Sequence, residues 1–302
     1  MRAIVTGSAG FIGGHLVEEL VGRGYRVTAI DRQSPTAGLA QHVVLDLADD
    51  PHGSGLTEAV SRADVVFHLA AVPGVRGSGP AVEQSRRLNN VIATMNLLSV
   101  VPLPVPVVAT SSSSVYGWLS AGHASREGDP LRPRGGYARS KQTMERVCEQ
   151  RRARGGVVAV MRPFTVAGEG QRPDMAFSTW LRALEAGEPI RILGSGDRTR
   201  DVTDVAHVVE GLIRAAEHGV NEAVNLGTGV SHRLIDMATT MLDLTGIDAE
   251  IVYQPVGVEE VDATRADTTR CRDLLSFVPE TDLRSLLTRQ IAAAAPLAGV
   301  AG

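Results

Sequence analysis

Tyr137 and Lys141 stand four residues apart, and Lys141 is the only lysine among the 30 basic residues of the chain. Residues at this spacing lie on one face of a helix, so the ammonium group can approach the phenol. A free phenol has a pKa of about 10 and is a poor base at neutral pH, but a nearby positive charge stabilises the phenolate. The pair can therefore take a proton from a substrate hydroxyl. The alternative is an ordinary exposed helix pair, and the unique lysine at this position argues against it.

Four consecutive serines at 111–114 follow an apolar run typical of a buried strand. A hydroxyl beside a general base can hydrogen-bond the substrate oxygen that gains or loses its proton. We therefore expect a serine of this run to complete a site with Tyr137 and Lys141.

Gly7, Gly10 and Gly13 separate an expected strand at 2–6 from an expected helix at 11–23. Glycines at this spacing allow a tight turn, and the first amides of the helix, near Phe11 and Ile12, can bind a pyrophosphate. A plain tight turn is the alternative reading. The strand before the glycines and the amphipathic helix after them favour a dinucleotide site.

Asp31 ends the next expected strand, where the ribose of a bound dinucleotide lies. A carboxylate there accepts hydrogen bonds from both ribose hydroxyls and repels a 2′-phosphate, which favours NAD over NADP. Arg32 works against this preference, because a guanidinium can pair with a phosphate. His68 is interpreted as a packed core histidine and not as a catalyst. Further residues at or after strand ends are expected beside the cofactor: Asp46, Leu47, Leu69, Ala70, Ala71 and Pro163.

The elements that must position these residues alternate between strand and helix. Strands are expected at 2–6, 25–30, 42–47, 63–70, 105–111 and 157–163, with helices at 11–23, 81–100 and 137–153. This alternation predicts an α/β fold, a Rossmann-type doubly wound parallel sheet.

After Pro163 the pattern becomes irregular. It contains expected helices at 175–187, 231–245 and 281–295, and short strands at 189–193 and 224–227. We interpret residues 1–165, with a returning segment at about 201–228, as an NAD-binding domain. Residues 166–200 and 229–302 are expected to form a smaller C-terminal substrate-binding lobe.

Composition excludes several classes of protein. The chain has 302 residues, 30 Lys and Arg against 34 Asp and Glu, and 43% hydrophobic residues, so neither a nucleic-acid partner nor a disordered chain is indicated. Cys148 and Cys271 are too few for a disulfide framework or a metal cluster, and no metal site is expected. The sequence shows neither an apolar run of the roughly 20 residues that a membrane helix needs nor a cleavable signal pattern, so no membrane partner and a cytoplasmic location are expected.

Eight stretches from residue 7 to about 279 carry a family resemblance. They include GSAGFIGGHL, HLAAVPGVR, NNVIATMNLL, TSSSSVYG, YARSK, RPFTVAGEGQRPDMAF, GSGDRTRDVTDV and RADTTRCRDLLSFVP. With these motifs the chain resembles the extended short-chain dehydrogenase/reductases, the NAD-dependent nucleotide-sugar epimerase/dehydratase family. The resemblance implies catalytic roles for Tyr137, Lys141 and Ser112, contacts of Tyr137 and Lys141 with the cofactor, and a homodimer formed through helices 81–100 and 137–153.

The residues after Ser112 discriminate among reactions of this family. Its 4,6-dehydratases carry an Asp-Glu pair at Ser113 and Ser114, and its uronate decarboxylases carry glutamate at Ser114; serine cannot replace an acid or base there. The serine run, the segment around Arg76 and Thr165 are similar to those of UDP-glucuronate 4-epimerases. The resemblance thus implies a UDP-sugar 4-epimerase, with UDP-glucuronate as the leading substrate and UDP-glucose or UDP-galactose as the alternative. A dehydratase, a net reductase and a non-catalytic NAD-binding regulator are weaker alternatives.

The resemblance also implies a nucleotide site. Arg172 and Arg200 match family arginines suited to phosphate oxygens, and Ile192 is expected near the uracil. The family has an arginine before a Pro-Gly-Asp segment that this chain lacks, and Arg265 is the candidate to replace it.

Overall fold

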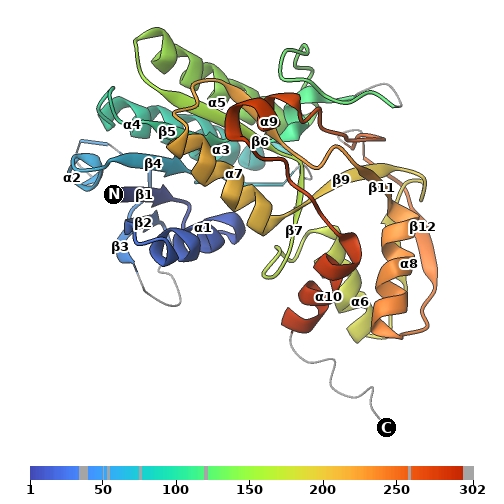
Figure 1. Ribbon diagram of the computed structural model, residues 1–302. Coiled ribbons are helices and arrows are strands. Elements are labelled where there is room, and N and C mark those ends of the chain that lie inside the picture. Colours follow the sequence, from blue (N-terminus) through green and yellow to red (C-terminus); the bar gives the residue numbers. More distant parts are fainter. Residues whose placement is uncertain are drawn as a thin grey trace.

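The computed structural model describes residues 1–33, 40–49, 51–52, 55–74, 77–118, 122–257 and 260–294. Its centre is a seven-stranded sheet in the order β10-β6-β5-β4-β1-β2-β3, and every pair of neighbours is parallel (Figure 1). The strands are β1 (Arg2–Thr6), β2 (Arg26–Asp31), β3 (Gln41–Val44), β4 (Val65–His68), β5 (Val107–Thr110), β6 (Val158–Pro163) and β10 (Ala223–Leu226). This sheet confirms the predicted doubly wound α/β fold.

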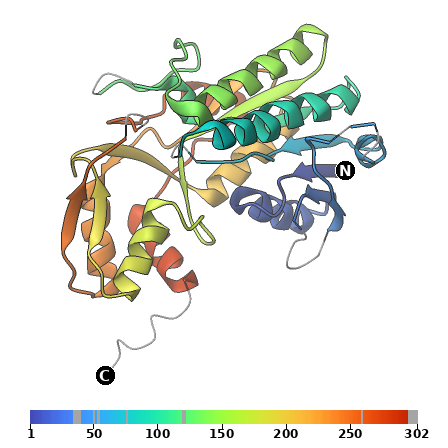
Figure 2. The same ribbon diagram turned by 180° about the vertical axis from the view of Figure 1, so that it is seen from behind.

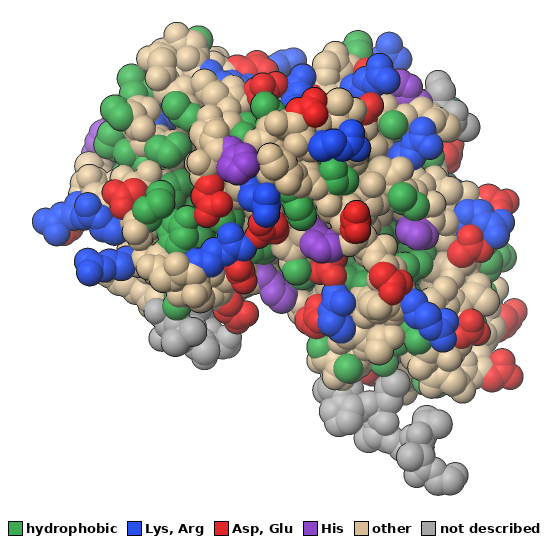
Figure 3. All heavy atoms as spheres, in the orientation of Figure 1, with side chains coloured by type: hydrophobic (Ala, Val, Ile, Leu, Met, Phe, Trp, Pro, Cys, Tyr) green, Lys and Arg blue, Asp and Glu red, His purple; other side chains and the backbone are tan. Residues whose placement is uncertain are grey.

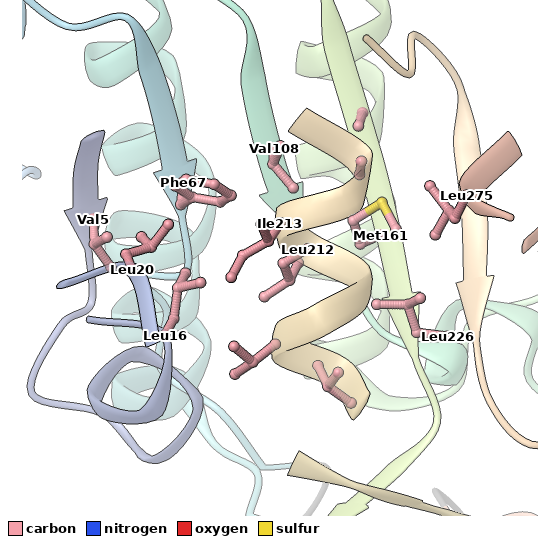
Figure 4. Packing of buried hydrophobic residues seen from close by; sticks show 14 of the residues in the cluster. Val5, Leu16, Leu20, Phe67, Val108, Met161, Leu212, Ile213, Leu226 and Leu275 are labelled. Carbon is pink, nitrogen blue, oxygen red and sulfur yellow. The ribbon is translucent and has the colours of Figure 1, made fainter. Parts of the chain in front are cut away.

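Helices cover both faces of the sheet. On the face toward the viewer in Figure 1 lie α1 (Phe11–Gly22), α7 (Val205–Glu217) and α9 (Thr269–Leu275). The opposite face, seen in Figure 2, carries α3 (Pro80–Arg86), α4 (Ala93–Val100) and α5 (Gly135–Ala153), while α2 (Leu56–Val60) lies at one side. Figure 4 shows how Leu16, Leu20, Leu212 and Ile213 from α1 and α7 meet Phe67 and other strand residues in one apolar cluster. Such two-layer burial accounts for the apolar runs in the strands.

The strand order reverses between β1 and β4. From β1 the chain builds β2 and β3 on one side and then returns to place β4 on the other side. In open α/β sheets, ligands bind outside the carboxyl ends of the strands at this switch point. The glycine turn after β1 and the segment after His68 both start at these ends.

The smaller lobe has its own apolar core. It is formed by α6 (Ala176–Glu185), α8 (Leu234–Thr245), α10 (Leu283–Ala293) and the paired strands β8 (Ile190–Leu193) and β12 (Ile251–Gln254). A second small sheet has the order β11 (Ser231–Arg233), β9 (Thr199–Asp204) and β7 (Thr165–Ala167). Several elements of this part of the chain were not predicted from the sequence, because short strands in irregular sequence give weak periodicity. These elements are strands β7, β9, β11 and β12 and helices α7 and α9.

The expected helix at 81–100 is interrupted. Between α3 and α4 the chain forms a π-helical turn, η1 (Arg87–Ile92), in which Asn90 is buried. Such turns are frequent at functional sites.

Charges of both signs are interspersed over the face shown in Figure 3. Among the described residues, no helix combines the length and apolarity needed to cross a bilayer. The described part of the chain also holds no cluster of three or more histidine, cysteine or acidic side chains able to bind a metal ion.

Candidate functional site

The glycine turn is a cradle that leaves no room for side chains. Gly7 has a φ of +73°, and a Cβ on it would lie 2.5 Å from the Ala70 amide nitrogen. A Cβ on Gly13 would lie 2.0 Å from the Gly7 carbonyl oxygen. Helix α1 begins directly after Gly10, with no side-chain cap and no acidic residue in its first turn, so its first amides, near Phe11, remain available to an anion. This cradle fits the pyrophosphate of a dinucleotide.

Asp31 lies beside this turn. Its carboxylate accepts hydrogen bonds from the amides of Ala9, at 3.1 Å, and Gln33, at 3.0 Å. Arg32 is about half exposed and lies 3.6 Å from a carboxylate oxygen of Asp46. The guanidinium that could pair with the 2′-phosphate of NADP therefore already lies beside a carboxylate. This arrangement favours NAD over NADP.

The other expected cofactor residues line the carboxyl edge of the sheet. Leu69 donates its amide to the Thr6 carbonyl at 3.1 Å, and Leu47 is buried. Ala70 and Ala71 follow β4, and Pro163 is the last residue of β6.

Tyr137 lies in the first turn of α5, and the structure brings Ser112 to it. Burial raises the pKa of the Tyr137 phenol; the charge of Arg172, a hydrogen bond with Ser112 and the charge of Arg86 oppose this rise. Ser112 follows β5 and caps the 3-10 turn η2 (Ser113–Tyr116) by accepting the Ser114 amide hydrogen at 3.2 Å. One hydroxyl of the serine run, that of Ser112, therefore lies within hydrogen-bond reach of the Tyr137 phenol.

Lys141 is buried one turn further along α5. Its Nζ donates to the Thr110 carbonyl at 2.8 Å. Burial lowers the pKa of Lys141 to about 8, against the opposing influence of Cys148 and Glu145. The ammonium is therefore held between the end of β5 and helix α5, and it loses its proton at a lower pH than an exposed lysine does.

The charges of two arginines, Arg172 and Arg86, act to lower the pKa of the Tyr137 phenol. Arg86 is buried and donates to the Gly74 carbonyl at 3.0 Å and to Glu83 at 2.9 Å. Arg172 holds Asp174 in a two-bond fork at 2.9 and 2.8 Å. Sequence reasoning missed Arg86, because a basic residue in a helix gives no sign of pointing inward, and it assigned Arg172 only to the diphosphate.

Of the hydroxyls expected to bind the sugar, those of Ser113 and Ser114 lie in the turn that Ser112 caps. Ser114 Oγ is buried and has no hydrogen-bond partner among the described residues. Ser113 is half-buried in the same turn, and Thr165 is half-buried in β7, paired with Val202 of β9. Arg76 lies outside the described residues. A buried hydroxyl without a partner is costly, so Ser114 is a natural ligand for a polar substrate group.

The remaining residues predicted to bind the nucleotide contact other parts of the same chain. Arg200 is mostly buried and donates to Glu260 at 3.0 Å; burial lowers its pKa, and Glu260 opposes the shift. Arg265 donates to the Gly122 carbonyl at 2.6 Å. The side chain of Ile192 packs in the core of the smaller lobe.

A buried ion pair that the sequence did not reveal lies under the site. Arg162 donates to both carboxylate oxygens of Glu145, at 2.9 and 2.6 Å, and Ser111 donates to the same carboxylate at 2.5 Å. Arg162 also donates to the Tyr116 hydroxyl at 2.9 Å, which in turn donates to Asn225 at 2.6 Å. Removing one partner of such a pair costs about 3–5 kcal/mol. The network therefore fixes α5, and with it Tyr137, on the sheet.

Comparisons with known proteins agree with this geometry. Residues 3–227 match the model of the NAD dependent epimerase/dehydratase family. An uncharacterized UDP-glucose epimerase of Bacillus subtilis is 31% identical over 97% of both chains, and a UDP-N-acetyl-alpha-D-glucosaminuronate decarboxylase of Bacillus cytotoxicus is 30% identical over 92% of both. The structure of a UDP-glucuronic acid 4-epimerase from Bacillus cereus, in complex with UDP-glucuronic acid and NAD, has a TM-score of 0.89 and 29% identity, covering 97% of this chain and 98% of its own. These matches confirm the prediction of NAD as the cofactor.

Proposed function

The chain belongs to the NAD-dependent epimerase/dehydratase family, and we propose that it is a UDP-sugar 4-epimerase that interconverts UDP-glucuronate and UDP-galacturonate. The observation that carries this proposal is the convergence of the serine run and Tyr137. Neutral hydroxyls stand next to the general base, and the positions in which the resembling dehydratases and decarboxylases carry carboxyl groups are Ser113 and Ser114.

In the proposed reaction, Tyr137 accepts the proton of the carbon-4 hydroxyl as the carbon–hydrogen bond at carbon 4 breaks. The glycine turn and Asp31 would hold NAD, which when bound would supply the acceptor and later the donor of that hydride. The resulting 4-keto sugar turns its other face, and Tyr137 gives its proton back to the oxygen as the hydride returns. Substrate and product are isomers, so the reaction consumes no oxidant.

The chain's own groups must make Tyr137 a base. Burial raises the pKa of this phenol, so it resists losing its proton. Arg172, Ser112 and Arg86 work in the opposite direction, and Ser112 can also hydrogen-bond the carbon-4 oxygen. Hydrogen bonds from a fixed hydroxyl strengthen as negative charge develops on that oxygen.

A uronate substrate makes a second demand on the site. The 4-keto intermediate of a uronic acid is a β-keto acid, which loses carbon dioxide when its carboxylate aligns with the ketone. Ser113, the unpartnered Ser114 and Thr165 can hold that carboxylate by hydrogen bonds without adding an acid or base. Arg172 and Arg200 are the proposed ligands of the diphosphate.

The test is incubation of the NAD-loaded protein with UDP-glucuronate and, separately, with UDP-glucose, with products identified by NMR. UDP-galacturonate is expected from the first. The variants Ser113→Ala and Ser114→Ala should raise KM for UDP-glucuronate or release carbon dioxide, whereas Ser99→Ala, on an exposed helix serine, should change neither. A 4-keto-6-deoxy product contradicts the epimerase proposal, and a pentose product from the wild type identifies a decarboxylase instead.

The second candidate is a 4-epimerase whose substrate is a UDP-hexose without a carboxylate, such as UDP-glucose. It is supported by the Bacillus subtilis relative, whose name specifies UDP-glucose. Faster turnover of UDP-glucose than of UDP-glucuronate, with no effect of the two serine variants, favours this candidate.

We also propose a cytoplasmic homodimer. Cys148 and Cys271 are both free and buried, as in a reducing compartment, and the α3–α4 segment exposes Leu88 and Met95. Within this dimer the seven-stranded unit is proposed to bind NAD and the smaller lobe the nucleotide sugar. Light scattering on the purified protein tests the dimer, and a Met95→Glu variant should shift it toward monomer.

A further inference from the structure

A line of buried polar groups runs from the glycine turn to the catalytic helix. Thr6 Oγ1 lies 2.8 Å from His68 Nδ1, and His68 Nε2 lies 2.8 Å from Thr94 Oγ1. Thr94 Oγ1 donates to the Asn90 carbonyl at 2.9 Å. Thr6, His68, Thr94 and Asn90 are each at most 3% exposed. These four residues come from β1, β4, α4 and the π-helical turn, so the line crosses the switch point of the sheet.

The line continues through side chains to Tyr137. Asn90 Nδ2 donates to Ser140 Oγ at 2.9 Å, and Ser140 Oγ donates to the Tyr137 carbonyl at 2.7 Å. Asn90 also binds the segment that follows β4. Its side chain accepts the Val72 amide hydrogen at 2.7 Å and donates to the Val72 carbonyl at 3.1 Å. We call the residues Thr6, His68, Thr94, Asn90 and Ser140 the polar line.

The partners determine the tautomer of His68. A carbonyl only accepts, so the Thr94 hydroxyl must give its proton to Asn90, and Thr94 Oγ1 can then only accept from His68 Nε2. Nδ1 is left as the acceptor of the Thr6 hydroxyl, while Thr6 Oγ1 accepts from the Ala70 amide at 3.4 Å. Every donor from Ala70 to Asn90 therefore points the same way, an arrangement in which the bonds strengthen one another.

Both ends of the polar line touch the proposed reaction centre. Thr6 directly precedes Gly7, and a Cβ added to Gly7 would lie 2.5 Å from the Ala70 amide nitrogen. At the other end, Ser140 bonds the backbone carbonyl of Tyr137, the residue whose phenol is the proposed base. We propose that His68 is a positioning residue, which sets the distance between the glycine turn and the first turn of α5 through this line; the inference rests on the proposed role of Tyr137.

The chemistry gives this spacing a consequence. Hydride transfer needs reacting atoms about 3–3.5 Å apart, and a misplacement of about 1 Å can cost about a hundredfold in rate. A positioning residue must not change its charge at working pH. Burial, reinforced by the charge of Lys141, lowers the pKa of His68 to about 3, so the ring stays neutral and keeps its tautomer.

The decisive comparison is between a single and a triple variant. His68→Phe keeps an aromatic ring but leaves the Thr6 hydroxyl without its acceptor and Thr94 Oγ1 without the donor at Nε2, so both stability and kcat should fall. Thr6→Val/His68→Phe/Thr94→Val removes the stranded hydroxyls as well, and replacing all partners by apolar groups of similar shape can restore stability. We expect Tm to recover in the triple variant while kcat stays at least about tenfold below wild type and KM for the UDP-sugar remains within about twofold.

A second measurement needs no substrate. Hydrogen exchange of the amides at 135–141 should be faster in both variants than in wild type, whereas His218→Phe, at an exposed histidine, should leave exchange and kcat unchanged. Recovery of kcat together with Tm in the triple variant overturns the proposal, as does unchanged exchange at 135–141. If His68→Phe does not fold, Thr94→Val must lower kcat without raising KM. Absence of wild-type turnover defeats the proposed function alone, because the exchange result still decides the role of His68.

Discussion

The cofactor half and the nucleotide-sugar half of the proposed site use different chemical groups. Around Gly7 and Gly13 the contacts are backbone against backbone, with no charged side chain in the first turn of α1. Around Arg172 and Arg200 the contacts are side-chain ion pairs with Asp174 and Glu260 of the same chain. The cofactor half thus needs no rearrangement of charge to receive a pyrophosphate, whereas a diphosphate near the two arginines must share them with carboxylates.

The two halves therefore differ in rigidity. A backbone cradle is fixed once the sheet forms, and any added atom disturbs it. Paired arginines are neutralised in the absence of a ligand, which compensates their burial, and an incoming anion gains less from them than from a free guanidinium. Tyr137 stands where the two halves meet, so its substitution should leave both binding functions in place.

Tyr137→Phe tests that boundary and has the largest expected effect. The phenol that transfers the proton is removed, so kcat should fall about a thousandfold while the affinities for NAD and UDP change little. Steady-state kinetics and calorimetric titrations measure the two quantities. Tyr25→Phe, which loses only an exposed bond to Glu217, is the control and should keep full kcat. Residual activity within tenfold of wild type removes Tyr137 from the role of base.

Gly13→Ala tests the backbone cradle and ranks second. The new Cβ collides with the Gly7 carbonyl at 2.0 Å, so the turn must open and NAD affinity should drop about a hundredfold, with a lower Tm. Gly14→Ala is a matched control on the same helix, where the nearest atom to an added Cβ is 3.9 Å away. Alanine there should stabilise the helix by up to about 1 kcal/mol. Equal effects of the two substitutions contradict the cradle.

Arg200→Met tests the ion-paired half. Loss of one charged hydrogen-bond donor is worth about 1.5–3 kcal/mol, so the affinity for UDP should fall about 10- to 100-fold while NAD affinity is unchanged. Arg191→Met removes an exposed arginine that pairs with Glu188 and should leave both affinities as they are. Unaltered UDP binding in Arg200→Met places the diphosphate elsewhere.

The smallest expected effect is the dependence of kcat and of stability on the titration of Lys141. Its pKa is lowered by burial from 10.5 to about 8, so kcat should decline by about half as pH rises to 8 if the ammonium form is required. The unfolded chain binds this proton more tightly, so unfolding takes up a proton between about pH 8 and 10.5 and stability relative to Lys141→Met should rise with pH in that window. A pH–rate profile and pH-dependent Tm values measure the two. The cation of the Lys141→Arg variant does not titrate in this range. If kcat of that variant declines in the same way, the decline belongs to another group.

Local spacing made part of this site predictable. Tyr137 and Lys141 share a helix, and Gly7, Gly10 and Gly13 share one turn, so the geometry of a single element was enough to relate them. Asp31 could be placed because parallel strands end at a common edge. The interrupted helix at 81–100 was not predictable, since nothing in its apolar pattern marks the π-helical turn at Arg87–Ile92.

The doubly wound fold, the nature of the cofactor site and the proposed base could be predicted from the sequence, because periodicity and turn chemistry act over a few residues. The partners of the buried polar groups became known only from the folded structure: Arg162 with Glu145, Arg200 with Glu260, and His68 between Thr6 and Thr94. The directly bonded partners in these sets lie between 17 and 62 positions apart. Which of 29 arginines meets which carboxylate depends on how helices and strands pack, and that packing is a property of the whole fold.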